Sequence, residues 1–387
     1  MLIASKDKPL ATTITGSLPR PSWFTQNLAG RSISTALADL TFREQYIDAI
    51  ATYVSDQVRA GIDILTDGDA RFDMDVGGRS WFSYMSERMS GTGPARMRPA
   101  PWSSKREQTP GDILHEVNEA RLPAKVVGPV GRGDLEYTRV WKVAQRMTDR
   151  HLKLGTCCGQ LLEAVLINEH YPRREELIAA VGKAMNEEYH LLADAGCPAI
   201  QLEEPLIHYV ASGPPGGLDA KFYVKEFNAE VAGLSDKTEV WVHTCWGNPA
   251  AQKVEVETSY EPALPFLNQL NVDAITFETA SDGGVAFESI GKGISKDKKI
   301  CIGAVNHRTL QVETPEQVAA LVRKALKYID AERLLVGTDC GFGRQGMSRM
   351  HAFYKMVSIV KGTNIVRKEL GLPESPCIAS EAKYSLL

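Results

Sequence analysis

The sequence predicts a single α/β domain, residues 1–387, built as a (β/α)8 barrel (TIM barrel). Three observations predict it: short β-branched or apolar runs recur along the chain, they end in small or polar residues, and segments with helical periodicity follow them. Strands that alternate with helices form parallel βαβ units, and nearly continuous apolar strands are typical of a sheet buried on both faces. A doubly wound open sheet is the alternative, but no GxGxxG or P-loop motif follows any predicted strand.

Nine candidate strands are one more than an eight-stranded barrel contains. We assign KVVGP (125–129) as the extra strand, because it leads into the polar sequence GRGDLEY and lies close to the next strand along the chain. The eight remaining strands are predicted at TTITGS (12–17), ILTDG (64–68), LKLGT (152–156), AIQLEE (199–204), VWVHTC (240–245), AITFETA (274–280), KICIGAV (299–305) and LLVGTDC (334–340).

The clearest helix is predicted to begin at Thr314 and Pro315. Thr314 and Gln317 have the spacing of a capping box, and proline suits the first helical position. The segment that follows carries one apolar stripe at helical spacing. The stripe consists of Val318, Leu321, Val322, Ala325, Leu326 and Ile329.

A long insertion is predicted after the second strand, over residues 77–112. This region is rich in Gly, Pro, Ser and Arg and includes GTGPARMRPAPWSS. It would lie over one mouth of the barrel, either as a solvated loop or as a lid. No internal repeat and no low-complexity tract divides the chain, so we expect one domain.

The composition is that of an ordinary globular protein, with 43% hydrophobic and 24% charged residues. A formal net charge of −4 gives no electrostatic reason to expect nucleic acid or an anionic membrane as a partner. No apolar run reaches the roughly 18–20 residues that span a bilayer. The N-terminal sequence lacks the regions of a signal peptide, and seven scattered cysteines form no disulfide pattern, so we expect a cytoplasmic protein with reduced thiols.

The stretch VHTCWGN (242–248) is the starting point for the function. His243 and Cys245 lie two residues apart in a predicted strand, so their side chains project from the same face. On its own this pair could be a buried cysteine beside a core histidine. Active sites of β/α barrels form at the carboxyl ends of the strands. Other chemically active side chains follow strands in the same way, namely Asp67, Asp69, Glu203, Glu204, Glu278 and Cys340.

Four of these strand-end residues supply one nitrogen, two sulfurs and one oxygen, a set that suits Zn²⁺. They are His243, Cys245, Glu278 and Cys340. Structural zinc sites gather their ligands in tight pairs on small loops, whereas these ligands come from separate strand ends that face a cavity. We therefore interpret the site as catalytic, with the hard oxygen of Glu278 as the ligand that loosens.

A zinc ion with these ligands is formally anionic and a poor Lewis acid toward water. It is better suited to bind a substrate thiol as the thiolate, because a thiol with a pKa of about 8.5 is mostly protonated at neutral pH without a metal. The site therefore predicts S-alkylation, in which the substrate sulfur attacks an electrophilic carbon. The non-catalytic alternative is a structural zinc ion that only stabilises the barrel.

These motifs resemble those of the cobalamin-independent methionine synthase family. The HxC motif, the later Glu278 and the DCG motif at 339–341 are similar to the zinc site of its catalytic barrel. TTITGSLPRP (12–21) resembles the family's first-strand motif, IQLEEP (200–205) resembles IQIDEP, and ILTDGD (64–69) resembles its second-strand acidic motif. The resemblance extends from about Thr12 to Arg367 and implies methyl transfer to a thiol such as homocysteine, from methyl-folate or another donor.

The resemblance also implies roles for individual residues. Gly16 and Ser17 would contact the thiol substrate, while Asp69 and Glu203 would hold its ammonium group. Two carboxylates at the mouth of a pocket also form a natural amine site on physical grounds, and their alternative role is pairing with arginines such as Arg71. The implied zinc ligands are His243, Cys245, Glu278 and Cys340.

Some features depart from the family pattern. The chain holds one barrel rather than the two of the plant and bacterial enzyme, and Asp69 and Glu203 exchange the usual Glu and Asp. The proton-donating histidine of the family falls, by direct count, on Arg308, next to His307. If His307 faces the pocket, it would act as a general acid toward the leaving group. If Arg308 does, it would bind an anion instead.

These departures raise a second candidate among the short single-barrel relatives, epoxyalkane:coenzyme M transferase, in which the same zinc activates a thiol against an epoxide. A sulfonate thiol calls for arginines, and the chain offers Arg20, Arg71, Arg79, Arg308 and Arg344 at or near strand ends. The retained acids Asp69 and Glu203 favour an amino-acid thiol. We therefore expect Zn²⁺ as cofactor and a small-molecule thiol and alkyl donor as partners, without nucleic acid or membrane; a homo-oligomer is left open.

Overall fold

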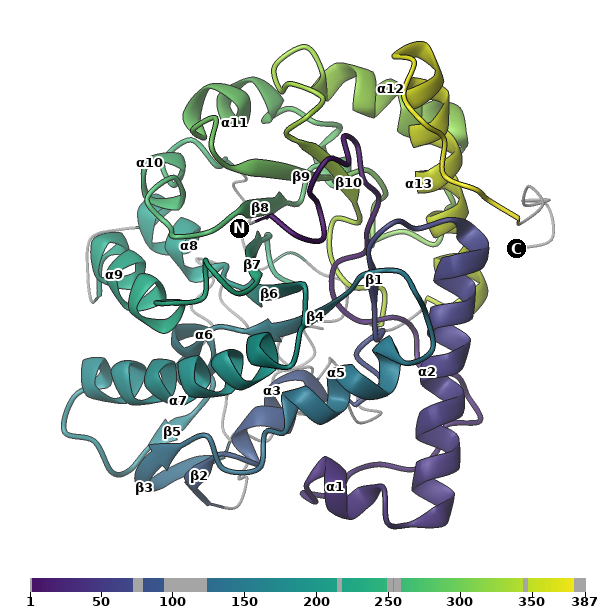
Figure 1. The fold of residues 1–387 in the computed structure, drawn as a ribbon. Coiled ribbons are helices and arrows are strands. Elements are labelled where there is room, and N and C mark those ends of the chain that lie inside the picture. Colours follow the sequence, from purple (N-terminus) through teal and green to yellow (C-terminus); the bar gives the residue numbers. More distant parts are fainter. Residues whose placement is uncertain are drawn as a thin grey trace, which may run out of the picture.

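The computed structural model describes residues 2–71, 79–93, 124–213, 218–248, 253, 259–343 and 347–378. Its centre is a curled, seven-stranded parallel sheet with helices around its outer face (Figure 1). The strand order is β1-β4-β6-β7-β8-β9-β10, so each strand lies beside its nearest sequence neighbours of the sheet. The bounds are β1 (Leu65–Thr66), β4 (Leu152–Cys157), β6 (Ala199–Glu203), β7 (Glu239–Thr244), β8 (Ala274–Phe277), β9 (Lys299–Gly303) and β10 (Leu334–Gly337).

The first predicted strand contacts both edges of this sheet. Thr12 forms a parallel bridge with Val336 of β10, and Thr13 forms one with Ile64, directly before β1. The Thr13 amide donates to the Val336 carbonyl at 2.9 Å, and the Ile64 amide donates to the Thr12 carbonyl at 3.0 Å. The segment therefore joins the two sheet edges through isolated bridges rather than through a long ladder.

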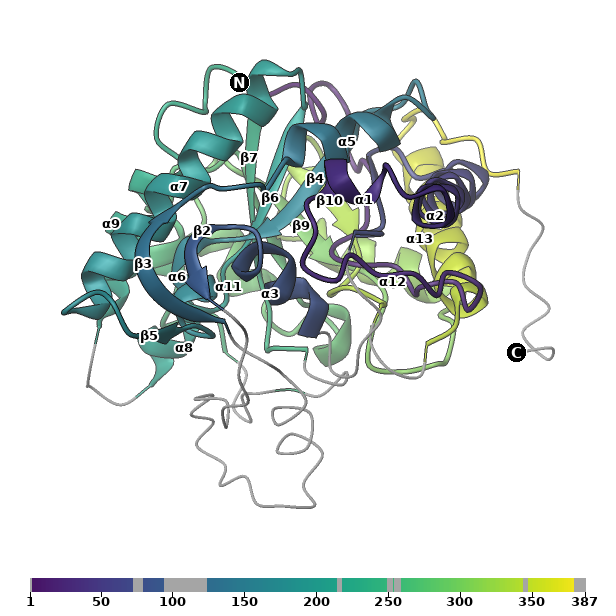
Figure 2. The ribbon, with the colours of Figure 1, turned by 90° about the horizontal axis from the view of Figure 1, so that it is seen from below.

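The assignment of KVVGP as the extra strand is confirmed. It forms β3 (Lys125–Gly131), which lies outside the main sheet in a three-stranded sheet of order β2-β3-β5. Its partners are β2 (Ser90–Gly93), which is antiparallel, and β5 (Ile167–Asn168), which is parallel. This second sheet and helix α3 (Arg79–Ser86) lie together at one side of the molecule (Figures 1 and 2).

Part of the predicted insertion, 77–112, forms regular secondary structure. Residues 79–86 form α3 and residues 90–93 form β2, while 77–78 and 94–112 lie outside the described residues. Tyr84 and Met85 of α3 are buried, and the Tyr84 ring stacks on Tyr137 with 6.0 Å between centroids. Apolar side chains within a Gly- and Ser-rich region thus anchor a helix to the core.

Helices follow the strands and cover the outer face of the sheet. The predicted helix start at Thr314 is confirmed, because Thr314 and Gln317 form both hydrogen bonds of a capping box and Pro315 is the first helical residue. Among the helices of the described segments, none combines the length and apolar character needed to cross a bilayer. The remaining bounds are α1 (Ile33–Ala36), α2 (Leu40–Ala60), α5 (Tyr137–Gln145), α6 (Gly159–Glu163), α7 (Arg174–Asp194), α8 (Leu206–Ser212), α9 (Ala220–Glu230), α10 (Leu264–Leu267), η3 (Ala280–Asp282), α11 (Phe287–Gly293), α12 (Pro315–Ala325) and α13 (Arg349–Glu369).

Alternation along the strands divides the core into two clusters. On β7, Val240 and Val242 belong to the large cluster beneath the helices, whereas Trp241 belongs to a small separate cluster. The small cluster contains Ala4, Ala11, Ile64, Ala199, Trp241, Ala274, Cys301 and Leu335, which come from the strands and the N-terminal segment, and therefore fills the inside of the curl. His243 lies two residues beyond Trp241, so its side chain also points inward, at the carboxyl end of the strand.

We predict that Asp63 is a main stabilising contact of the N-terminal segment. Its carboxylate accepts hydrogen bonds from the Thr12 amide at 2.7 Å, from Arg367 Nη2 at 2.6 Å and from the Ser375 hydroxyl. Asp63→Asn should lower the free energy of unfolding in urea by about 2 kcal/mol, the typical value for hydrogen bonds to a charged group. Asp48→Asn, at an exposed position of α2, is the matched control and should change it by less than about 0.5 kcal/mol.

The loss of unfolding free energy caused by Asp63→Asn should also depend on pH. Burial opposes ionisation of Asp63, but Arg367 and the hydrogen bonds outweigh it and lower its pKa. A carboxyl group with a lowered folded-state pKa stabilises the protein fully above its unfolded pKa of about 3.9 and loses this effect as the pH falls through the folded value. The difference between wild type and Asp63→Asn should therefore be constant near neutrality and shrink below about pH 4. A difference that grows on acidification would contradict the assignment.

Candidate metal centre

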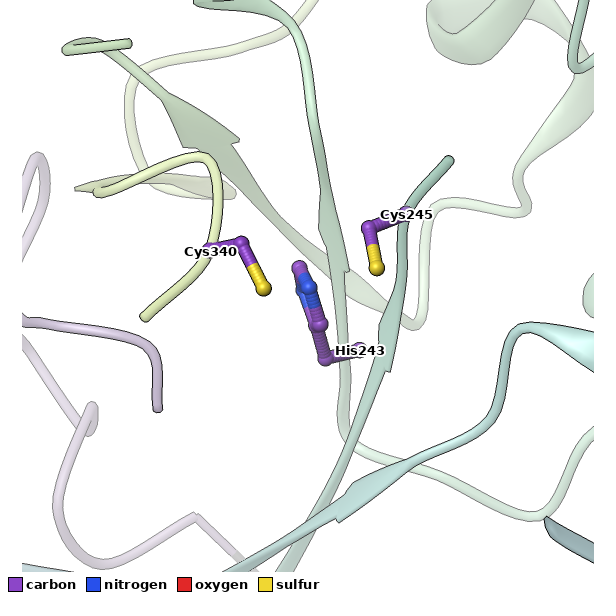
Figure 3. A group of neighbouring side chains, drawn as sticks. All are labelled: His243, Cys245 and Cys340. Carbon is purple, nitrogen blue, oxygen red and sulfur yellow. The ribbon is translucent and has the colours of Figure 1, made fainter. Parts of the chain in front are cut away.

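A histidine and two cysteines from distant parts of the chain meet at the carboxyl ends of β7 and β10 (Figure 3). His243 is on β7, Cys245 follows that strand, and Cys340 lies just beyond β10. One donor atom from each residue lies within 4.8 Å of the donor atoms of the other two, and all three residues are buried. The structure thus brings together three of the four residues that the sequence predicts as metal ligands.

The group fits a zinc-type ion. Donor atoms around a tetrahedral zinc lie about 3.5–3.8 Å apart, given Zn–S near 2.3 Å and Zn–N near 2.0–2.1 Å, so a small contraction would close the three around an ion. Within the described part of the chain, neither ring nitrogen of His243 has a hydrogen-bond partner, which is unfavourable for a buried imidazole. Cys245 and Cys340 are not joined by a disulfide. An imidazole and two thiols are a preferred donor set for zinc.

The surroundings attract positive charge to this group. Burial would lower the pKa of His243, but the charge of Glu203 and contact with Cys340 raise it to about 9. His243 Nε2 lies 3.6 Å from Glu203 Oε2. The contact between the two thiols lowers the pKa of Cys340 and raises that of Cys245.

Glu203 connects the group to a chain of polar side chains inside the sheet. Burial raises the pKa of Glu203 to about 7, although the neighbouring His243 opposes the shift. Gln201 Nε2 donates to Glu203 Oε1 at 2.9 Å, and Lys153 Nζ donates to Gln201 Oε1 at 2.7 Å. Lys153 is buried 4.4 Å from the centre of the Trp241 ring, and burial lowers its pKa to about 8. The base of the site is therefore polar and internally hydrogen-bonded.

Asp69, the second predicted ammonium-binding residue, is paired with an arginine. Arg71 Nη1 donates to Asp67 Oδ2 at 2.9 Å and to Asp69 Oδ1 at 3.2 Å, while Arg71 Nη2 donates to the Gly155 carbonyl at 2.5 Å. This is the pairing given above as the alternative role of Asp69. Two carboxylates share one guanidinium, so the cluster retains a net negative charge if both are ionised.

Glu278 does not join the histidine and the two cysteines. Its carboxylate instead lies in a second group with His307 and Asp339, whose donor atoms also lie within 4.8 Å of one another. Arg308 holds both carboxylate oxygens: Nε donates to Oε1 at 3.0 Å, and Nη2 donates to Oε1 at 2.9 Å and to Oε2 at 2.8 Å. The predicted fourth ligand therefore forms a buried ion pair. Both His307 and Arg308 reach the site, and the anion that Arg308 binds is a protein side chain.

Gly16 and Ser17 lie against the loop that carries Cys340. The Ser17 carbonyl accepts hydrogen bonds from the Phe342 amide at 2.7 Å and from the Gly343 amide at 2.9 Å. Gly16 has φ +70°, and a Cβ atom there would lie 2.8 Å from the Gly341 Cα. Glycine is required for this conformation and this close approach. The first-strand motif and the DCG loop thus form one backbone unit beside the cysteine.

Asn248 is a site residue that the sequence analysis missed. Its Nδ2 donates to Cys340 Sγ at 3.4 Å and to the Gly341 carbonyl at 3.1 Å. An N–H donor to a ligand sulfur orients the ligand and stabilises its thiolate. The signal was present, because Asn248 ends the VHTCWGN stretch, but the spacing in one strand does not reveal a contact with the end of another.

The fold and the site define a class of protein: an α/β protein with a curled parallel sheet and a buried histidine–dithiol group at its strand ends. The sequence matches the family described as "Cobalamin-independent synthase, Catalytic domain" over residues 107–362. A methionine synthase from Saccharolobus islandicus (strain Y.G.57.14 / Yellowstone #1) is 30% identical over 369 residues, covering 95% of this chain and 97% of that protein. The methionine synthase of Sulfurisphaera tokodaii is 28% identical over 364 residues, covering 93% and 94%.

Solved structures show the same relationship. The B12-independent methionine synthase from Shewanella sp. W3-18-1, in complex with selenomethionine, superimposes with a TM-score of 0.75 at 26% identity and covers 94% of this chain and 99% of that one. A putative vitamin-B12-independent methionine synthase from Listeria monocytogenes shares the fold, with a TM-score of 0.64 at 17% identity and coverage of 91% and 96%. The chain belongs to the cobalamin-independent methionine synthase family, as its motifs predict, and this membership implies a methyltransferase.

Substitution of Gly16 should destabilise the loop of Cys340. Gly16→Ala should cost about 1–2 kcal/mol for a side chain at positive φ, and a further 1–3 kcal/mol or so for the clash with Gly341. Gly30→Ala is the matched control, because Gly30 has φ +75° but nothing within 4 Å of the position that a Cβ atom would take. Urea unfolding of both variants measures the difference. Equal losses would show that the close approach of Gly16 to Gly341 contributes nothing.

Proposed function

We propose that this protein transfers a methyl group to the sulfur of homocysteine, with one zinc ion as its resident metal. The observation that carries the proposal is the burial of His243, Cys245 and Cys340 around one point in a chain of the methionine synthase family. We further propose a single domain in which the N-terminal segment closes the curled sheet into a (β/α)8 barrel. The bridges of Thr12 and Thr13 to the two sheet edges support this closure.

In the proposed reaction, a carbon–sulfur bond forms while the bond between the methyl group and its donor breaks. The substrate thiol loses its proton, and the leaving group of the donor gains one. Zinc held by His243, Cys245 and Cys340 would keep the substrate sulfur as a nucleophilic thiolate at neutral pH. Asn248 orients Cys340 through its N–H···S contact. His307, buried beside Glu278 and Asp339, is our candidate for the general acid toward the leaving group.

The acidic residues of the site support an amino-acid thiol. The Asp67–Asp69–Arg71 cluster carries a net negative charge when ionised, and Glu203 adds a buried carboxyl group. An ammonium group is the natural ligand of such carboxylates. We therefore assign Asp69 and Glu203 to the ammonium of homocysteine, and Gly16 and Ser17, beside the Cys340 loop, to the thiol end. The donor would be methyl-folate or another methylated small molecule.

The alternative, addition of a sulfonate thiol to an epoxide, is not favoured. The relatives named above are methionine synthases. Two of the arginines that could have bound a sulfonate are engaged with carboxylates, Arg71 with Asp67 and Asp69 and Arg308 with Glu278. Arg20 donates to the Phe24 and Gln26 carbonyls. The side chains of Arg79 and Arg344 are outside the part of the chain that the structure describes.

Removal of either cysteine of the centre should abolish metal binding. Purified protein should contain one zinc per chain, and Cys245→Ser or Cys340→Ser should retain less than about a tenth of it after dialysis, because thiolates are the strong ligands of this set. Cys377→Ser, at a half-buried cysteine near the C-terminus, should keep the full amount. Metal content by elemental analysis is the measurement. Stoichiometric zinc in both site variants would show that the metal site is elsewhere.

The identity of the acceptor should follow from a thiol comparison. We expect product with homocysteine and methyl-folate, and no product with mercaptoethanesulfonate and epoxypropane, when S-alkylation is followed by mass spectrometry. Turnover with the sulfonate pair alone would reverse the assignment. X-ray absorption of the zinc form should gain a sulfur neighbour when homocysteine is added. An unchanged spectrum would indicate a structural zinc ion that stabilises the fold and does not bind substrate.

A further inference from the structure

We propose that Lys153 is a positioning residue for substrate recognition: through Gln201 it fixes the Glu203 carboxylate, so that the site selects thiols that carry an ammonium group. This inference rests on the proposed function and deepens it, because it names what orients the ammonium-binding carboxylate. Lys153 lies near the start of β4, inside the curled sheet, and touches neither substrate nor metal in this proposal.

The first argument is that Lys153 is a buried charge without an ion pair. It is 1% exposed, and it forms no ion pair with a carboxylate of the described residues. Its ammonium group instead donates to Gln201 Oε1 at 2.7 Å and lies 4.4 Å from the centre of the Trp241 ring. Burial of an ammonium group costs free energy that an amide and a ring offset only in part. A methionine would pack here without that cost, so the charge itself calls for a functional explanation.

The second argument is that the ammonium group decides which way the Gln201 amide faces. An ammonium group has donors but no acceptor, so the amide oxygen faces Lys153 and the amide nitrogen faces away. Burial lowers the pKa of Lys153 only to about 8, so this charged form prevails at neutral pH. Gln201 Nε2 then donates to Glu203 Oε1 at 2.9 Å. In the flipped amide, a donor would face a donor and an acceptor would face an acceptor.

The third argument is that the surrounding strands hold the lysine in this position. Gly155 lies opposite Gln201 on the neighbouring strand, and its lack of a side chain leaves the inner face open there. A Cβ atom at Gly155 would have only Asp69 Oδ1 within 4 Å, at 3.8 Å. The Trp241 ring beside Lys153 is fixed in turn, because its Nε1 donates to Glu239 Oε2 at 2.8 Å. Lys153 therefore has both the space to reach Gln201 and a rigid ring to lie against.

The fourth argument is the oxygen of Glu203 that this arrangement leaves for a ligand. Gln201 occupies Oε1, whereas Oε2 accepts no hydrogen bond within the described residues and lies 3.6 Å from His243 Nε2. Oε2 is thus on the side of the histidine–dithiol group. A carboxylate held at one oxygen does not turn freely, so the other oxygen keeps a fixed place relative to the thiols. This arrangement sets the spacing between sulfur and ammonium nitrogen that a substrate must have.

The test compares the binding of homocysteine with that of γ-mercaptobutyrate, which is homocysteine without its amino group, by titration calorimetry of the zinc protein. We expect the wild type to bind homocysteine about a hundredfold more tightly, as is usual for hydrogen bonds between charged groups. Lys153→Met, which is similar in length but uncharged, should lower this ratio about tenfold, the usual effect of removing a residue that orients a ligand group. The loss should fall on homocysteine, because only its ammonium group uses the orientation of Glu203.

Two further variants test the connection itself. Gln201→Met removes the connecting amide and should lower the ratio as Lys153→Met does. The double variant Lys153→Met/Gln201→Met should lose no more than either single variant, since Lys153 acts only through Gln201. Lys299→Met is the matched control, because Lys299 is also buried and donates to the Ser5 carbonyl, but at the opposite end of the sheet. It should leave both dissociation constants within about twofold of wild type.

The outcomes separate this inference from the proposed function. An unchanged ratio in Lys153→Met, or losses that add in the double variant, would overturn the inference and leave the proposed function intact. Loss of zinc from Lys153→Met would also overturn it, because the lysine would then support the metal centre. If Lys153→Met does not fold, an unchanged ratio in Gln201→Met overturns it instead. A wild type that binds both thiols equally would show that Glu203 does not bind the ammonium group, and the inference would fall together with that assignment.

Discussion

One imidazole and two thiols can share an ion only if the ends of β7 and β10 reach the same point. Two strands, β8 and β9, lie between them in the sheet, and neighbouring strands are about 4.8 Å apart, so a flat sheet would separate β7 and β10 by about 14 Å. Because the sheet is curled, side chains on its inner face point toward one another, and the donor atoms of His243, Cys245 and Cys340 come within 4.8 Å of one another. The contact of Gly16 with Gly341 fixes the loop of Cys340, which makes the N-terminal segment part of the centre although it supplies no metal ligand.

The charged groups around the centre are arranged before any ligand binds. Arg71 binds two carboxylates, Arg308 binds Glu278, and Lys153 reaches Glu203 through Gln201. Buried charges without such partners would be costly, and the partners also fix the side-chain positions. The site therefore offers a substrate a rigid pattern of charge rather than a set of mobile side chains. Within the described part of the centre, the His243 ring lacks a hydrogen-bond partner at both nitrogens, and that is where a metal fits.

Much of the fold could be predicted because strands buried on both faces leave long apolar runs in the sequence. The same logic failed for β2 and β5, since SGTG has no apolar run and β5 has only two residues. Tyr84 and Met85 converted part of the expected loop into a helix through burial that local composition does not reveal.

The candidate site likewise has features that the sequence predicts and features that it does not. The meeting of His243, Cys245 and Cys340 follows from the predicted barrel topology, because a curled parallel sheet turns the side chains at its strand ends toward one another. The partners of Glu278 and Asp69 do not follow from it. Each carboxylate had an arginine within reach, and the choice between a metal or substrate and that arginine depends on side-chain distances, as does the contact of Asn248 with Cys340.

The two bridges of the N-terminal segment have a consequence for biosynthesis. Thr12 leaves the ribosome well before its partner Val336, which is made 324 residues later. Until then the nascent chain carries an open sheet edge, which exposes it to chaperones and to association with other chains. Cys340 emerges later still, so the three side chains of the proposed metal site coexist only after the whole segment from His243 to Cys340 has been synthesised.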